Sequence, residues 1–294
     1  MSAAAPARRT GRSRGRFAPY LLMMPGGLWL ALFFVVPIVA MLATSLMSGS
    51  PDQGFQLTWR VSEYWTVLRQ YHGIFLRSLS YAMLATVITL IVAYPMAYWI
   101  AFHGGRRKTT FLLVLLLPFF VSFVIRTLAW GFILSDQGIV LGTLKHWHLL
   151  PGTFHVLATP AAVVSGIAYN FLPFMALPLY VSLENIDRRV VEAAGDLYAG
   201  RFQTFRRVIL PLSIPGVFAG FLLTFVPAAG DYVNQSILGG TGTTMIGNII
   251  QSKYLSSFEY PAASALSTIL MAGLLIGVFA YARVLGARSL EAYV

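Results

Sequence analysis

Residues 190–216 read VVEAAGDLYAGRFQTFRRVILPLSIPG and separate two long apolar segments of the chain. The first part of this stretch predicts a helix, because apolar side chains recur at helical spacing on one face and charged side chains on another. Such a helix either lies across a membrane surface and presents its charged side to a soluble partner, or is an ordinary solvated loop. The apolar face is formed by Ile186, Val190, Ala193 and Leu197, and the charged face by Arg188, Glu192 and Asp196.

The composition is that of a membrane protein. Of the 294 residues, 57% are hydrophobic and 11% are charged, and the mean hydropathy is +0.71. A soluble domain of this size cannot bury so much apolar surface. Crossing a bilayer takes about 20 apolar residues. The predicted fold is an all-α integral membrane protein with six transmembrane helices, at residues 18–46, 75–102, 109–134, 155–182, 208–230 and 263–286.

The positive charges predict the orientation of the chain. With the N-terminus in the cytoplasm, most of the 21 lysines and arginines fall on the cytoplasmic side, whereas aspartate and glutamate divide evenly. This is the bias that the positive-inside rule describes, so the net charge of +11 is a topology signal and we expect no nucleic-acid partner. Both termini and residues 184–207 are then cytoplasmic. Cysteine is absent, which excludes disulfides and thiolate metal sites.

The expected organisation follows from these helices. Residues 1–16 are rich in Ala, Arg and Gly and predict a disordered cytoplasmic segment. Residues 17–73 hold the first transmembrane helix, which is too long for a cleaved signal peptide, and an external loop. In that loop the aromatic residues around Trp65 predict an interfacial helix. Residues 74–287 form a five-helix core that contains the 184–207 insert, and residues 288–294 are a cytoplasmic C-terminus.

No nucleotide or metal site is expected in this chain. Residues 104–110, GGRRKTT, lack the glycine that precedes the lysine of a phosphate-binding loop, because Arg107 stands there. ATP and Mg²⁺ must therefore belong to a partner. His146, His148 and His155 lie close in sequence without a carboxylate or thiolate among them, so interfacial anchoring is a better account than a metal site.

The 190–216 stretch resembles the coupling segment of the membrane subunits of bacterial ABC importers that depend on an external binding protein. The signature of that family is Glu-Ala-Ala, three residues, Gly, nine residues, an apolar residue, any residue and Leu-Pro. Tyr198 departs from it, because the family usually has glycine there, and we expect Gly200 to take over the turn. The matching residues are Glu192, Ala193, Ala194, Val208, Leu210 and Pro211.

Further stretches resemble the spermidine/putrescine branch of this family. They are residues 118–130, 134–140 and 230–248, so the resemblance covers nearly the whole chain. Pro25 and Pro37 in the first helix suit the longer permease of that branch, which is usually paired with a second, shorter one.

The resemblance implies a permease with the type I ABC importer fold, in the bacterial inner (plasma) membrane, that is not itself an enzyme. The implied partners are an ABC ATPase dimer, a second and different permease subunit, and an extracytoplasmic substrate-binding protein. The implied cargo is a small cation, first of all a polyamine, with other small cations, opines and phosphonates as alternatives. Docking on the ATPase is expected of Glu192, Ala193, Ala194, Asp196, Leu197, Leu210 and Pro211.

Candidates for the translocation pathway come from polar and aromatic residues within or beside the helices. A straight helix from Lys108 places Arg126 near the outer interface, where it either extends to the lipid headgroups or lines the mouth of the pathway. Asn170 interrupts the fourth helix, and polar side chains there usually face other helices or a cavity. The five candidates are Arg126, Trp130, Asn170, Asp231 and Tyr232.

Two other function classes compete with the importer. The runner-up is a secondary, ion-coupled transporter, but such carriers usually keep an ionisable group within the membrane, and here no carboxylate falls at a predicted midplane. A membrane-embedded enzyme ranks third, since no constellation of His, Ser and Asp lies at a common depth. The scarcity of countercharges also predicts that selectivity resides mostly in the binding protein, with cation–π contacts assisting a cationic cargo.

Two glycine pairs predict close helix packing or a subunit interface. Gly216 and Gly220 are four residues apart in the fifth helix, and Gly273 and Gly277 in the sixth. Small residues at this spacing let two helices approach closely within a membrane.

Overall fold

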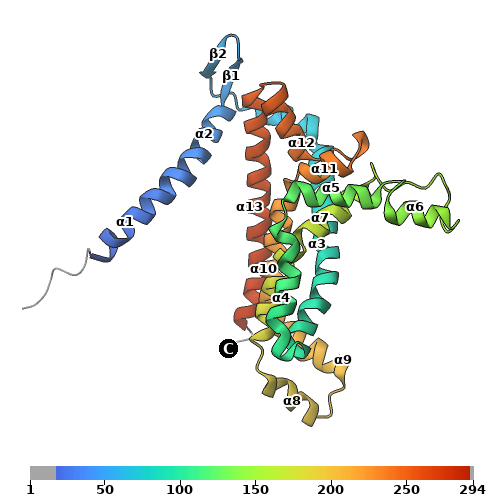
Figure 1. Ribbon diagram of the computed structural model, residues 1–294. Helices are drawn as coiled ribbons and strands as arrows, with labels where there is room; N and C mark the ends of the chain where they lie inside the picture. Colours follow the sequence, from blue (N-terminus) through green and yellow to red (C-terminus); the bar gives the residue numbers. More distant parts are fainter. Residues whose placement is uncertain (1–17, 292–294) are drawn as a thin grey trace, which may run out of the picture.

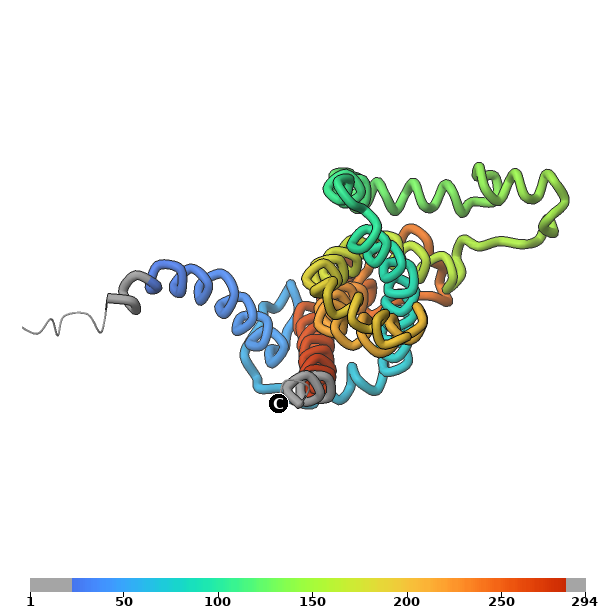
Figure 2. The backbone as a smooth tube through the Cα atoms, turned by 90° about the horizontal axis from the view of Figure 1, so that it is seen from below, coloured from blue at the N-terminus to red at the C-terminus, as the bar shows by residue number. Residues whose placement is uncertain are grey.

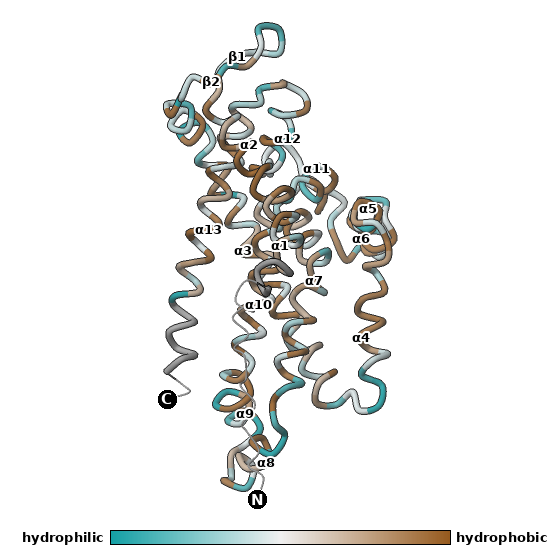
Figure 3. The backbone as a smooth tube through the Cα atoms, turned by 90° about the vertical axis from the view of Figure 1, so that its left-hand side faces the viewer, coloured by the Kyte–Doolittle hydropathy of each residue, from teal (hydrophilic) through white to brown (hydrophobic). Residues whose placement is uncertain are grey.

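The computed structural model describes residues 18–291, with side chains from residue 23 to residue 283. The segment 1–16, expected to be disordered, lies outside the described residues. Long helices form an upright bundle, with α8 and α9 at one end and a small hairpin at the other (Figure 1). Hydrophobic residues occupy the middle of this bundle and polar residues gather at its two ends (Figure 3), as expected of a protein that crosses a bilayer.

The elements follow one another along the chain in a simple order. They are α1 (Ala18–Leu30), η2 (Ala31–Val35), α2 (Val36–Ser45), β1 (Met47–Ser50), β2 (Gly54–Leu57), α3 (Ser62–His103), η3 (Gly105–Arg107), α4 (Lys108–Leu116), η4 (Leu117–Phe120), α5 (Phe123–Leu134), α6 (Ile139–His146), α7 (Pro160–Glu184), α8 (Arg188–Asp196), α9 (Arg201–Thr204), η5 (Phe205–Ile209), α10 (Leu210–Ala229), α11 (Val233–Leu238), η6 (Thr241–Thr243), α12 (Ile246–Gln251), η7 (Ser252–Ser256) and α13 (Tyr260–Glu291).

Within the described residues, six helical segments are long and apolar enough to cross a membrane, which confirms the predicted number. All six overlap the positions expected from the sequence, although the third shares only residues 123–134 with the expected 109–134. The helix expected around Trp65 is present, but it is continuous with the second transmembrane helix in the 42-residue α3. The six are Met23–Ser45, Ser62–His103, Phe123–His146, Pro160–Glu184, Arg201–Ala229 and Tyr260–Arg283.

The prediction of one continuous helix over residues 109–134 is wrong. The helix that starts with α4 ends after η4, the next two residues are extended, and α5 then begins in a new direction. α4 runs along the bundle, whereas α5 runs across it (Figure 1). Pro118 lies in η4 and has no backbone N–H for a continuing helix, which favours the break. The depth of Arg126 therefore cannot be counted along a straight helix from Lys108.

The core of the bundle is formed by α3, α7 and α10, and the first glycine pair explains how closely the last two pack. A Cβ atom at Gly216 would lie 2.8 Å from the carbonyl oxygen of Pro178, and one at Gly220 would lie 2.7 Å from Met175 Sδ. The predicted close approach is thus confirmed for this pair. Around Gly273 and Gly277 there is open space, so that pair does not pack within the described part of the chain.

The first transmembrane helix stands apart from the bundle. α1, η2 and α2 extend sideways from it, and α2 is the part that packs against α13 (Figure 2). The π-helical segment η2 lies between Pro25 and Pro37. The chain then forms an antiparallel hairpin in which Met47 of β1 pairs with Leu57 of β2. The all-α prediction did not include this hairpin.

Candidate functional site

The coupling segment lies at the end of the bundle opposite the hairpin (Figure 1). Asp187 caps α8, because its carboxylate accepts a hydrogen bond of 2.9 Å from the backbone N–H of Arg189. The guanidinium of Arg188 donates a bond of 3.4 Å to the carbonyl of Ala101 and so ties α8 to the end of α3. Asp187 thus supplies the N-cap of α8, and the Glu192 side chain stays exposed.

The predicted apolar face of α8 is only partly right. Ile186 is buried and Val191 packs beside it against the core. Val190, Ala193 and Leu197, however, are exposed. Ile186 precedes the helix, so the predicted face does not extend back to it, whereas Val190, Ala193 and Leu197 keep the helical spacing along α8. α8 therefore presents apolar and charged side chains together to the outside.

All seven residues expected to dock on an ATPase lie at this end of the molecule. Glu192, Ala193, Asp196 and Leu197 are exposed on or directly after α8, and Ala194 is half-buried. The remaining two, Leu210 and Pro211, are exposed at the start of α10.

Tyr198, at the position where the family signature has glycine, adopts a backbone conformation that favours glycine. Its φ is +58°, in the left-handed region, and its side chain is 97% exposed. Gly200 is extended, with φ −64° and ψ 159°, and precedes α9, so the expectation that it takes over the turn is wrong. A left-handed conformation costs a residue with a Cβ atom about 1–2 kcal/mol. The segment thus keeps its turn at the expense of local strain.

Two pathway candidates, Asn170 and Asp231, meet in a buried polar network at the junction of α5, α7 and α11. The amide of Asn170 donates bonds of 2.9 Å to Thr127 Oγ1 and to Asn234 Oδ1. Asn234 in turn donates from its amide to Asp231 Oδ2. The sequence reasoning missed Thr127 and Asn234. Asn234 stands three residues after Asp231, a spacing at which side chains meet within one turn, and this was the available signal.

Burial shapes the chemistry of this network. It raises the pKa of Asp231, because the charged form is desolvated, while hydrogen bonds from Asn234 and from the N–H of Val233 act in the opposite direction. Asn170 is fully buried, and its Oδ1 has no hydrogen-bond partner among the described residues. Buried polar atoms are normally paired, so this network holds a free acceptor within the bundle.

Arg126 is buried against aromatic rings. Arg126 is only 7% exposed, which contradicts the alternative that its side chain extends to lipid headgroups. The guanidinium carbon lies 4.6 Å from the ring centroid of Phe119 and 5.7 Å from that of Phe123. Such distances indicate cation–π contacts.

The other two pathway candidates lie outside the polar network. The indole of Trp130 stacks on Tyr169 at 5.1 Å between centroids and donates a bond of 3.3 Å to Ser165 Oγ, both on α7. Tyr232 is 42% exposed, and its carbonyl accepts a bond of 2.9 Å from the amide of Asn248.

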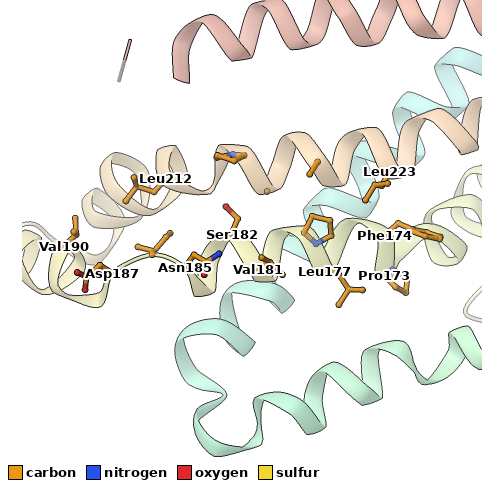
Figure 4. A pocket seen from close by; sticks show the side chains of 15 residues that line it. Pro173, Phe174, Leu177, Val181, Ser182, Asn185, Asp187, Val190, Leu212 and Leu223 are labelled. Carbon is orange, nitrogen blue, oxygen red and sulfur yellow. The ribbon is translucent and has the colours of Figure 1, made fainter. Parts of the chain in front are cut away.

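An open groove of about 800 Å³ runs along α7 and α10 (Figure 4). It begins between Phe174 and Leu223 and ends beside Asp187 and Val190 at α8. Its walls are mostly apolar, and its polar side chains gather at the α8 end. The groove therefore connects the level of the bundle core with the coupling segment.

Comparison with known proteins decides the family of a chain with this architecture. Residues 93–290 match the family described as binding-protein-dependent transport system inner membrane component. The chain belongs to this family. It is 37% identical to the spermidine/putrescine transport system permease protein PotB of Haemophilus influenzae, over 90% of this chain and 93% of that protein. The resemblance to this branch of ABC importer permeases is thereby confirmed.

Solved structures agree on the fold. A chain of a bacterial ABC transporter involved in the import of the acidic polysaccharide alginate superimposes with a TM-score of 0.66 at 17% identity, covering 94% of this chain and 96% of that one. A chain of bacterial alginate ABC transporter in complex with alginate pentasaccharide-bound periplasmic protein gives 0.62 at 17% identity, covering 90% and 93%. This chain thus has the type I importer fold and is an inner-membrane permease subunit.

Proposed function

We propose that this chain is one of two permease subunits of a binding-protein-dependent importer whose cargo is a polyamine. The observation that supports a polyamine cargo is the similarity to a spermidine/putrescine permease along nearly the whole chain. The mostly apolar lining of the groove between α7 and α10, with the ring of Phe174 at one end, supports it, since such walls suit an organic cation with hydrocarbon segments.

The energy for transport comes, in this proposal, from an ATPase dimer that binds α8. The support is the exposed set of side chains on α8 and the tie between Arg188 and the end of α3, which transmits movement of α8 to the bundle. The groove between α7 and α10 ends at α8. Movement of the ATPases therefore reaches the groove through α8 and switches its access from one side of the membrane to the other.

The remaining partners and the orientation follow from the same assignment. A second, different permease completes the pathway, and an external binding protein delivers the cargo at the hairpin end. α8 and the end of α13 lie at the cytoplasmic side, as the distribution of lysine and arginine indicates. ATP and Mg²⁺ are held by the partner ATPase and not by this chain.

Uptake of radiolabelled spermidine by proteoliposomes tests the function. We expect uptake from the complete assembly with binding protein and internal ATP, and none when the ATPase subunits are omitted. Uptake by liposomes that contain this chain alone would instead support a secondary transporter. Pull-down of the tagged chain in mild detergent, followed by mass spectrometry, identifies the ATPase and the second permease independently.

Replacement of Ala193 tests the docking assignment. Ala193→Arg adds a long charged side chain to an exposed position of α8, so we expect the loss of stimulated ATP hydrolysis and of uptake with unchanged expression. Ala193→Ser, which keeps a small uncharged side chain at the same exposed position, is the matched control and is expected to behave as wild type. Normal uptake by the Ala193 variant contradicts the docking role.

A further inference from the structure

Four phenylalanines form a continuous aromatic cluster beside the groove. The ring centroids of Phe119 and Phe174 are 5.0 Å apart, those of Phe171 and Phe174 are 5.9 Å apart, and those of Phe123 and Phe171 are 6.0 Å apart. The rings come from η4, α5 and α7, which meet where the chain turns after α4. Phe174 also lines the groove between α7 and α10 (Figure 4), so the cluster extends from the groove into the bundle.

The guanidinium of Arg126 already occupies one side of this cluster. It lies over Phe119 and Phe123, and its Nε is buried with no hydrogen-bond partner. Within residues 23–283, none of the ion pairs involves Arg126. A buried charge is normally paired with an opposite charge, because desolvation is costly. Here the negative faces of the aromatic rings take the place of a carboxylate.

We propose that the cluster of Phe119, Phe123, Phe171 and Phe174 is a binding site for organic ammonium groups on the translocation pathway, and that Arg126 fills it as a built-in competing cation. This inference rests on the proposed cationic cargo. Arginine suits the role because its planar, weakly hydrated guanidinium stacks on aromatic faces. An ammonium group that enters from the groove reaches Phe174 first and displaces the guanidinium from the shared rings.

The guanidinium of Arg126 lowers the affinity of the aromatic cluster for a cationic cargo, so that the cargo can be released again. A pathway site must bind its cargo weakly enough to release it. Arg126 competes for the rings and repels a second positive charge, so the permease by itself holds a polyamine only weakly. Selectivity then remains with the binding protein, as the scarcity of carboxylates already indicates.

The test is equilibrium binding of radiolabelled spermidine to the complete purified transporter without its binding protein. We expect Arg126→Gln, which removes the charge and keeps much of the side-chain volume, to bind spermidine at least about tenfold more tightly than wild type. Arg69→Gln is the matched control, because the Arg69 guanidinium also lies over a ring, that of Trp65 at 5.7 Å, but on an exposed part of α3. An Arg126→Gln transporter that assembles and melts as wild type but binds no more tightly overturns the inference.

A second variant tests the inference in case Arg126→Gln does not fold. Phe174→Leu keeps an apolar side chain at the groove and removes the ring, so we expect spermidine uptake by the complete transporter to fall severalfold while assembly is kept. In the double variant with Arg126→Gln, the gain in binding should disappear. A purely structural role of Arg126 predicts no such dependence on Phe174, and unchanged uptake by Phe174→Leu overturns the inference even if Arg126→Gln does not assemble.

The outcomes also separate this inference from the proposed function. If the complete wild-type transporter imports spermidine and Arg126→Gln gains no affinity, only the built-in cation is wrong. If the wild type imports no spermidine, and sulfate used as an anionic probe binds in a manner that requires Arg126, then Arg126 recognises an anion and both proposals fail.

Discussion

The first transmembrane helix and α7 are both hydrophobic, yet the more hydrophobic of the two is the less buried. In the most apolar 18-residue window of Met23–Ser45 the mean hydropathy is 2.3 and no residue is buried within the chain, whereas in that of Pro160–Glu184 the mean hydropathy is 1.6 and 67% of the residues are buried. Hydropathy in a membrane protein therefore reports the ability to cross lipid, and not the position of a helix in the bundle.

The side chains explain the difference. The first helix is rich in large apolar residues such as Trp29, Phe33 and Phe34, which are exposed and suit contact with lipid or with another subunit. α7 instead carries small and polar residues such as Gly166 and Asn170, which are buried. Helices in membranes associate through small residues and interhelical hydrogen bonds, since lipid is as apolar as leucine.

The largest effect is expected from enlarging a glycine in the α7–α10 contact. Gly220→Leu places a side chain where a Cβ alone would lie 3.0 Å from the backbone oxygen of Met175 on α7. We expect a loss of about 3 kcal/mol in the free energy of unfolding, because overpacked helices must separate. Gly27→Leu in α1, where nothing lies within 4 Å, should leave stability almost unchanged. Thermal melting in detergent measures both, and equal losses would show that the first helix is as tightly packed as α7.

An intermediate effect is expected from removing the central amide of the polar network. Asn170→Leu leaves Asn234 and Thr127 without their bonds to α7, and we expect a cost of about 1–2 kcal/mol, the range for polar contacts between membrane helices. Thr44→Val in α2 is the control, because the Thr44 hydroxyl donates to the carbonyl of Ala40 in its own helix. The same melting experiment applies, and an effect of Thr44→Val as large as that of Asn170→Leu contradicts the assignment.

The smallest effect concerns the exposed coupling segment, where backbone strain and not packing limits stability. Tyr198→Gly removes the left-handed strain, and Tyr198→Ala removes the side chain but keeps the strain. We expect the glycine variant to be more stable than the alanine variant by about 1 kcal/mol or less. Chemical unfolding in mixed micelles compares them, and a more stable alanine variant would mean that the left-handed turn does not form.

Much of the fold followed from local patterns. The length of the apolar stretches predicted six membrane-crossing segments, and the Glu192–Pro211 spacing predicted an exposed coupling segment, because both depend on residues close together in the chain. The third segment was predicted less well. Pro118 was the available signal of a break, but the predicted helix ran through it, and the direction of α5 across the bundle depends on its packing against α7 and α11.

The candidate pathway was predicted only residue by residue. Asn170 and Asp231 were recognised as polar positions within or beside apolar helices. Their partners Thr127 and Asn234 were identified only from the structure, because these contacts join α5, α7 and the start of α11, which are far apart in sequence. The sequence also left two positions for Arg126. Burial against Phe119 contradicts the headgroup position, and this contact was not predictable, because it depends on how η4 and α5 turn and not on spacing along the chain.

The sequence by itself determined that this protein is a membrane protein and which segments carry the basic residues, and it predicted the segment on which a partner docks, since hydropathy, charge and the coupling signature are properties of short segments. Only the tertiary structure decided which apolar helix is buried, that Tyr198 takes the turn of a glycine, and that Arg126 rests on phenylalanine rings. Those outcomes depend on contacts between elements far apart in sequence, where the shapes and charges of several side chains must be satisfied at once.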